Sequence, residues 1–207
     1  MKNLNKYIQE NTCINEKLII AHNRYSCTPQ TKEELKEIIK ERLEKDPNAD
    51  LNDIDVSNII DMSKLFYELD PHNIDISKWN VSNVENMDRL FFGCENFNSD
   101  LSRWDVSNVK DMYMMFWGCE NFNSELTRWN VSKVKDMNCM FRYCKNFDSD
   151  LSKWNVLKVE NMIRMFEGCK KFNSDLNNWN VSNVRYMRNA FKDCDSMTKL
   201  PTWYVEK

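Results

Sequence analysis

Apolar residues recur along this chain with a period of twenty-five residues. The clearest marker of the period is a tryptophan, found at Trp79, Trp104, Trp129, Trp154 and Trp179. A degenerate first copy begins at Leu51, and a truncated copy begins at Leu200. Repeats of this length bury their apolar faces by stacking on their neighbours, so the period predicts a repeat architecture.

Within one copy, the polar and apolar positions predict a strand followed by a helix. In the copy from Leu101, Trp104 and Val106 alternate with a polar residue, as in a short strand. A helical stripe follows, formed by Val109, Met112, Met115 and Phe116. Gly118 suits the left-handed end of such a helix. We therefore expect an α/β fold, a right-handed solenoid of about six 25-residue coils, each with a short strand and a short helix.

The first fifty residues follow a different pattern. Thr31 to Glu34 form a capping box, and the apolar stripe of a helix follows until Asp46 and Pro47 end it. Residues 17–25 are typical of a strand. The pattern predicts an N-terminal α/β cap over residues 1–50, the repeats over residues 51–199 and a truncated C-terminal coil over residues 200–207.

Composition narrows the classes of function. The net charge of −3 over 207 residues gives no basic excess for nucleic acid. Three glycines exclude the common phosphate-binding loops, and two histidines leave little for catalysis. No apolar run is long enough to span a bilayer, and Met1 to Cys13 has no secretory signal pattern. We expect no enzyme activity, no cofactor, no nucleic-acid partner and no membrane span.

The tryptophan and cysteine positions of the repeat predict two ladders along the stack. The tryptophans fit a core better than a sugar-binding strip, because their inward neighbours are aliphatic. The second ladder comprises Cys94, Cys119, Cys144, Cys169 and Cys194. A row of thiols fits neither metal ligation nor consecutive disulfides well, so we interpret these residues as buried free thiols. Outside this ladder, Cys13 and Cys27 in the cap are the one pair that could form a disulfide.

An acidic and a basic column run through the same repeat. The acidic column comprises Asp75, Asp100, Glu125, Asp150 and Asp175, and the basic column comprises Lys78, Arg103, Arg128 and Lys153. Calcium is one way to relieve the repulsion in the acidic column. We favour neutralisation by the basic column and capping of turns by the carboxylates, and we expect no metal.

The residues that depart from the repeat are the candidates for binding. Four residues are aromatic or methionine where most other copies are polar, namely Phe92, Tyr113, Met114 and Trp117, and Arg142 and Tyr143 continue the strip in the next copy. Exposed aromatic side chains beside arginine have the composition of a binding hot spot. The alternative is that these rings cover the ends of the helices or meet the cap.

The repeat motif W-[ND]-V-S-x-V-x-[ND]-M-x-x-[ML]-F-x-x-C-x-x-F-N-S-D covers residues 51–205. It resembles the bacterial surface-protein repeat of about 25 residues, which occurs in BspA-like leucine-rich-repeat proteins and in mycoplasma-type lipoproteins of unknown function. The resemblance implies a leucine-rich-repeat-like, non-enzymatic protein that acts in adhesion or host-protein binding. It also implies a place at the cell surface or outside the cell, whereas the lack of a signal pattern leaves the cytoplasm open.

The leading hypothesis is therefore a protein-interaction or adhesion module with a host or envelope protein as partner. Two alternatives are an intracellular scaffold or effector and a carbohydrate-binding or hydrolytic protein. The last requires exposed tryptophans and a carboxylate pair in a pocket.

Overall fold

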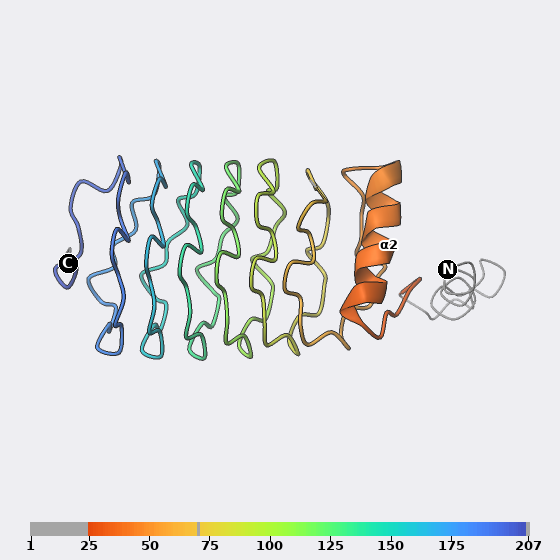
Figure 1. The fold of residues 1–207 in the computed structure, drawn as a ribbon, viewed down its shortest axis with the longest axis horizontal. Coiled ribbons are helices and arrows are strands. Elements are labelled where there is room, and N and C mark those ends of the chain that lie inside the picture. The colour runs from red at the N-terminus through yellow and green to blue at the C-terminus, as the bar shows by residue number, and fades with distance from the viewer. Residues whose placement is uncertain (1–24, 70, 206–207) are drawn as a thin grey trace.

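The computed structural model describes residues 25–69 and 71–205. Successive copies of the repeat lie one behind another along the longest axis, with helix α2 (Lys32–Lys45) beside the first copy (Figure 1). Equivalent residues of neighbouring copies meet in isolated parallel bridges, for example Asp111 with Asp136 and Asp136 with Asn161. The predicted stacking of copies in register is therefore present.

The predicted α/β solenoid of strand-plus-helix coils is wrong. Across residues 25–69 and 71–205, α2 is the one helix, and isolated bridges stand in place of any sheet. The predicted strand at Trp104 to Val106 is irregular backbone, and the predicted helix from Val109 to Phe116 is a series of turns.

Left-handed backbone explains why the repeats contain no helix. In the copy from Leu101, Met114 has a φ of 52° and Gly118 a φ of 75°. Each of the other five copies holds the same pair of left-handed positions, four residues apart. A right-handed helix requires negative φ at every residue, so neither position is compatible with one. Tight turns instead carry the apolar pattern, as when Met115 N–H donates to Met112 O at 3.2 Å.

Backbone hydrogen bonds between copies replace the sheet that the sequence predicts. In one copy, alternate N–H groups donate to carbonyls 24 residues later. The four donors are Met112, Met114, Phe116 and Gly118, at N···O distances of 2.8–3.0 Å. We call these bonds rungs. Since the intervening N–H groups donate within their own turns, both sets of backbone donors are satisfied.

The tryptophans predicted as core are buried, with 3–4% of their surface exposed. Successive rings from Trp129 to Trp179 stack with centroids 6.4 Å apart. Each indole N–H donates to a carbonyl 28 residues earlier, as from Trp129 to Leu101 at 3.0 Å. The ladder therefore buries apolar area and also satisfies a backbone acceptor in the previous copy.

The cysteine ladder is also buried, and its thiols are free. Cys119, Cys144 and Cys169 donate to phenylalanine carbonyls of the previous copy at 2.9–3.0 Å. Burial raises the pKa of these three thiols well above the usual value. Such thiols stay protonated and are poor nucleophiles or metal ligands. The considered disulfide involves Cys13, which lies outside the described residues.

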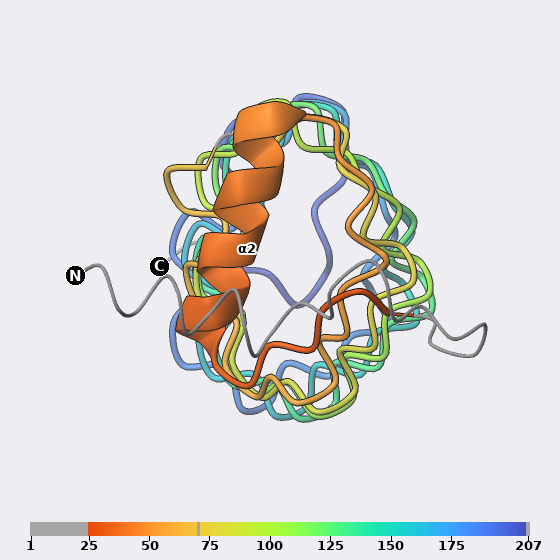
Figure 2. The same ribbon diagram turned by 90° about the vertical axis from the view of Figure 1, so that its right-hand side faces the viewer.

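Helix α2 begins and ends where the sequence predicts. Thr31 is the N-cap, and its Oγ1 accepts from Glu34 N–H at 3.2 Å. The apolar face with Leu35, Ile38 and Ile39 is buried, and α2 lies across the end of the stack (Figure 2). Of the predicted strand at residues 17–25, all but Tyr25 lies outside the described residues.

No helix in the described part of the chain combines the length and hydropathy needed to cross a bilayer.

Candidate functional site

A row of partly exposed aromatic rings follows the stack through four copies. Phe92 and Trp117 are stacked, with centroids 4.5 Å apart and planes 7° from parallel. Tyr67 contacts Phe92 at 5.8 Å, and Tyr143 meets Trp117 edge-on at 5.8 Å. We call Tyr67, Phe92, Trp117 and Tyr143 the aromatic surface. The structure therefore brings together three of the predicted aromatic residues.

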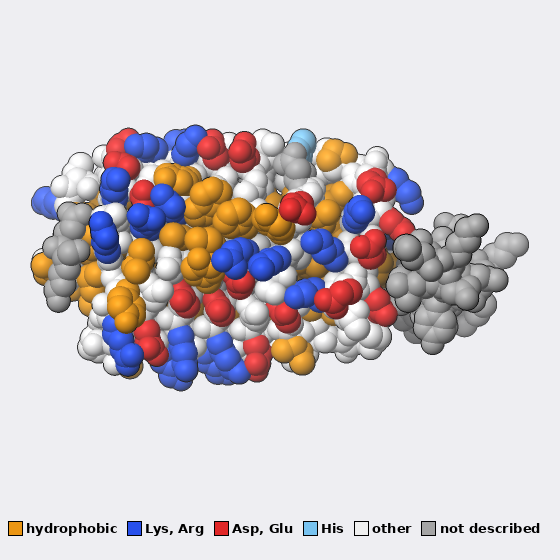
Figure 3. All heavy atoms as spheres, viewed as in Figure 1, with side chains coloured by type: hydrophobic (Ala, Val, Ile, Leu, Met, Phe, Trp, Pro, Cys, Tyr) orange, Lys and Arg blue, Asp and Glu red, His pale blue; other side chains and the backbone are white. Residues whose placement is uncertain are grey.

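The position of these rings in the repeat explains their exposure. Tyr67, Phe92 and Trp117 each follow the buried phenylalanine of their own copy. In the next copies this position carries Arg142, Glu167 and Lys192. Tyr67 is 37% exposed, and the other rings of the surface are half-buried. Figure 3 shows a band of hydrophobic side chains along the middle of the stack, between charged side chains.

A cluster of charged side chains adjoins the last ring of the aromatic surface. The Arg142 guanidinium lies 4.5 Å from the ring centroid of Tyr143, and its Nη2 donates to the Tyr143 hydroxyl at 2.6 Å. Arg142 also pairs with Glu167 at 3.2 Å, while Arg164 Nε lies 3.3 Å from the same carboxylate. Glu167 thus fixes Arg142 against Tyr143, which holds this ring edge-on to Trp117.

Burial and charge compete at this cluster. Burial lowers the pKa of Arg142, but Glu167, Tyr143 and Cys139 together outweigh burial and raise that pKa. Arg142 Nε is buried without a hydrogen-bond partner in the described residues, and Glu167 Oε2 has the ion pair with Arg164 but no hydrogen bond. Unsatisfied groups cost about 1–3 kcal/mol each, so the cluster is costly to keep.

Tyr113 and Met114 are placed differently from the prediction. With no helix, Tyr113 and Trp117 are not neighbours on a helical face, and Tyr113 stacks under the Arg89 guanidinium at 4.5 Å. Met114 is half-buried and holds left-handed backbone. The predicted set therefore divides into the aromatic surface with Arg142, and a separate Tyr113–Arg89 contact.

The prediction missed Tyr67, Arg89 and Glu167. Tyr67 lies in the degenerate first copy, yet it shares a repeat position with Phe92 and Trp117. Alignment of that position across the copies is the signal that would have identified it. The burial of Glu167, whose side chain is 6% exposed, has no signal in the sequence because charged residues are normally exposed.

The acidic column caps turns, as the sequence analysis favours. Asp75, Asp100 and Asp150 each accept from the N–H of a serine two residues later, at 2.9–3.0 Å. Hydrogen bonds from Ser102 lower the pKa of Asp100, and those from Ser152 lower the pKa of Asp150. Among the described residues, no ion pair joins the acidic and basic columns, and no three His, Cys, Asp or Glu side chains form a metal-binding group.

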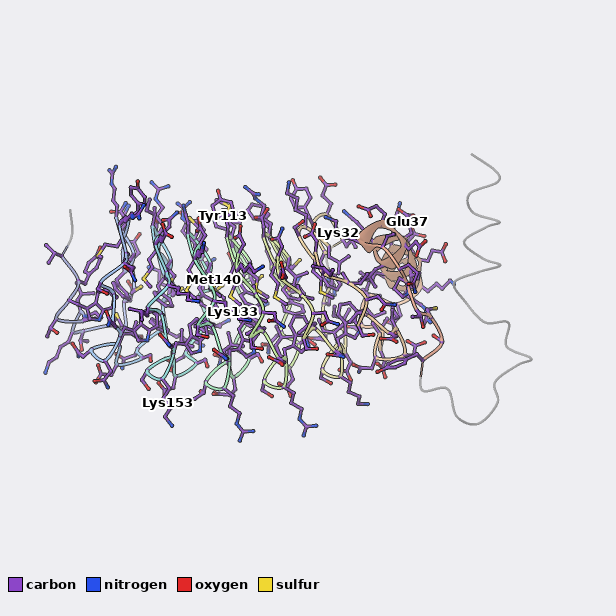
Figure 4. All side chains as sticks on the ribbon, turned by 90° about the horizontal axis from the view of Figure 1, so that it is seen from below. Lys32, Glu37, Tyr113, Lys133, Met140 and Lys153 are labelled. Atoms are coloured by element: carbon purple, nitrogen blue, oxygen red, sulfur yellow. The ribbon has the colours of Figure 1, made fainter. Side chains whose placement is uncertain are left out.

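Lys153 of the basic column lies away from Tyr113. Figure 4 shows Lys153 projecting from one side of the stack and Tyr113 lying on the opposite side, with Met140 between them.

These features define a repeat protein with buried aromatic and cysteine ladders and one aromatic surface. The chain belongs to the family described as "Mycoplasma protein of unknown function, DUF285", whose model matches residues 33–142 and 122–207. This family match confirms the mycoplasma-type domain of unknown function that the repeat motif implies. No curated protein and no solved structure matches the chain.

Proposed function

We propose that this chain is a non-enzymatic protein-interaction module and that a protein partner docks on the aromatic surface. The proposal extends the resemblance to BspA-like repeat proteins, and it includes adhesion to a host or envelope protein as the biological role. The observation that carries it is the row of partly exposed rings formed by Tyr67, Phe92, Trp117 and Tyr143.

The four rings are not required by the core, and they offer contact area to a protein partner. The core does not need them, since each copy already buries a phenylalanine, together with a tryptophan or, in the first copy, Ile54. Large aromatic side chains supply much contact area with few rotatable bonds, and they dominate the energy of many protein interfaces. Because the rings are already stacked, a partner orders few side chains when it binds.

Site-specific photo-crosslinking on the full chain tests the proposal. We expect Phe92→p-benzoylphenylalanine to capture a defined protein from intact cells or host extract. The matched control is Leu157→p-benzoylphenylalanine, because Leu157 is 41% exposed but lies outside the aromatic surface. Adding Trp117→Ala and Tyr143→Ala to the Phe92 probe variant should reduce the yield at least fivefold.

Two results would contradict the proposal. The first is equal capture of the same protein from positions 92 and 157. The second is an unchanged yield after Trp117→Ala with Tyr143→Ala, in a variant whose circular dichroism spectrum and unfolding midpoint show an intact fold.

A further inference from the structure

A pocket of about 360 Å³ opens beside the aromatic surface, between the first two copies of the repeat. Phe92 belongs to both the pocket and the aromatic surface. Glu68 from the first copy and Gly93, Glu95 and Asn96 from the second also line the pocket. A side chain of a partner docked on the rings would therefore lie within reach of this pocket.

The pocket exists because a rung is missing. In the next copies Gly93 N–H donates to Trp117 O at 2.7 Å, and Gly118 N–H donates to Arg142 O at 2.8 Å. The corresponding bond from Glu68 to Phe92 is absent among the hydrogen bonds of the described residues.

The cysteine ladder is also looser at this junction. Cys94 Sγ lies 3.7 Å from Phe66 O, whereas Cys119 Sγ lies 3.0 Å from Phe91 O. The first copy has Leu69 and His72 where later copies have the ladder cysteine and a core phenylalanine. These departures from the repeat open the first junction.

The residues that line this pocket provide hydrogen-bond acceptors and negative charge. Glu68 and Glu95 are exposed, and no ion pair involves either carboxylate in the described residues. In later copies, the residues equivalent to Glu95 pair with one another: Glu120 pairs with Lys145, and Lys170 pairs with Asp195. Among the members of this column that the structure describes, Glu95 has no ion-pair partner, so its charge is left for a binding partner.

The lining also offers a backbone acceptor. Phe92 lines the pocket, and its carbonyl lacks the rung that the equivalent carbonyl of Trp117 accepts. A guanidinium presents several donors in one plane, so it matches two carboxylates and a carbonyl better than an ammonium does.

We propose that this pocket binds an arginine side chain of the protein partner. The inference rests on the proposed function and adds the chemistry of the partner, namely a basic residue next to the segment that covers the rings. The carboxylates supply the charge selection, and the stacked rings supply the adjoining apolar contact.

Titration of the full chain by NMR tests the pocket with defined probes. We expect Nα-acetyl-argininamide to shift the amide signals of Gly93 and Asn96 in a saturable way, with a dissociation constant on the order of millimolar. The neutral isostere Nα-acetyl-citrullinamide should bind at least fivefold more weakly. Nα-acetyl-lysinamide should also bind more weakly than the arginine probe.

Variants then locate the binding. Glu68→Gln with Glu95→Gln should weaken the arginine probe at least fivefold, with the dispersion of the spectrum unchanged. Glu120→Gln is the matched control, because Glu120 has the same place in the next copy but is paired with Lys145. Equal binding of citrullinamide or lysinamide, or equal losses in the control and the pocket variant, would overturn the proposal.

The outcomes for the two proposals are separable. If argininamide binds as expected but the crosslinking test fails, the pocket stands and the docking role of the rings is lost. If crosslinking succeeds but the pocket variants bind argininamide like the unmodified chain, the rings bind a partner without this arginine.

Discussion

At the scale of single residues, the left-handed positions govern both the turn of each copy and the shape of its surface. Tyr143 holds a φ of 65° at a place where Gly118 and Gly168 stand in the adjacent copies. A methyl group on Gly168 would lie only 2.6 Å from Tyr143 Cδ1, whereas one on Gly118 would meet the nearest atom at 3.7 Å. Gly168 therefore leaves the space in which the Tyr143 ring lies.

A comparison of two alanine variants tests this role. Gly118→Ala should cost about 1 kcal/mol of unfolding free energy, because alanine tolerates left-handed backbone poorly. Gly168→Ala adds the clash with Tyr143, and we expect a total cost of about 2–3 kcal/mol. Urea unfolding measures both values, and Trp117 fluorescence should change only in Gly168→Ala. Equal costs would show that the ring moves away without strain.

At the scale of elements, local signals predict α2 correctly and the repeats incorrectly. Thr31 and Glu34 interact within four residues of sequence, so the helix start is encoded locally. In the repeats, Arg89, Met114 and Cys139 adopt positive φ although none of these residue types favours it. Rungs to the next copy hold this backbone, and contacts 24 residues away leave no signal in local spacing. The period was therefore predictable, whereas the turns were not.

The N-cap of α2 gives a prediction about the end of the stack. Thr31→Ala removes the acceptor for Glu34 N–H and should destabilise the helix by about 1 kcal/mol. Hydrogen exchange of the α2 amides should accelerate about fivefold, since 1 kcal/mol corresponds to that ratio. Thr28→Ala serves as a control, because Thr28 lies outside the helix. Similar acceleration in both variants would contradict a capping role.

The turn-capping carboxylates predict a loss of stability in acid. Hydrogen bonds from Ser102, Ser107 and Ser152 lower the pKa of Asp100, Asp105 and Asp150 in the fold. A lowered pKa means that the stabilisation is present above the unfolded value of about 3.9 and is lost as pH falls through the folded value. The melting temperature should therefore fall below about pH 4.

The triple variant Asp100→Asn, Asp105→Asn and Asp150→Asn isolates this effect. Asparagine keeps the acceptor oxygen, as Asn130 shows by capping Ser132 N–H at 3.2 Å, but it does not titrate. We expect a shallower decline of melting temperature between about pH 4 and 2 than in the unmodified chain. Parallel declines in the two proteins would assign acid unfolding to other carboxylates.

At the scale of the whole molecule, the aromatic surface depends on the stack for its existence. Phe92, Trp117 and Tyr143 were predictable because each differs from the residues that most other copies carry at the same position of the repeat. Tyr67 shares the repeat position of Phe92 and Trp117 and was predictable from the same alignment. Arg89 was not, because its contact with Tyr113 crosses from one copy to the next and its residue type is ordinary at that position. The missing rung at Glu68 likewise depends on a mismatch between two whole copies rather than on one residue.

The two ends of the stack are protected unequally, which predicts where unfolding begins. Helix α2 covers the first copy, whereas Val184 and Met187 of the last full copy are only partly buried. The equivalent residues of the preceding copy, Val159 and Met162, are buried. Local opening costs least where few apolar side chains are fully buried.

Hydrogen exchange followed by NMR should therefore show a gradient along the stack. We expect the amides of Met187, Asn189 and Phe191 to exchange at least 100-fold faster than those of Met137, Cys139 and Phe141, which hold the same positions in a central copy. Trp203 stacks on Trp179 at 6.2 Å, so Trp203→Ala should extend the fast exchange into the copy that begins at Leu176. Central amides that exchange as fast as terminal ones would instead indicate that the stack opens as a single cooperative unit.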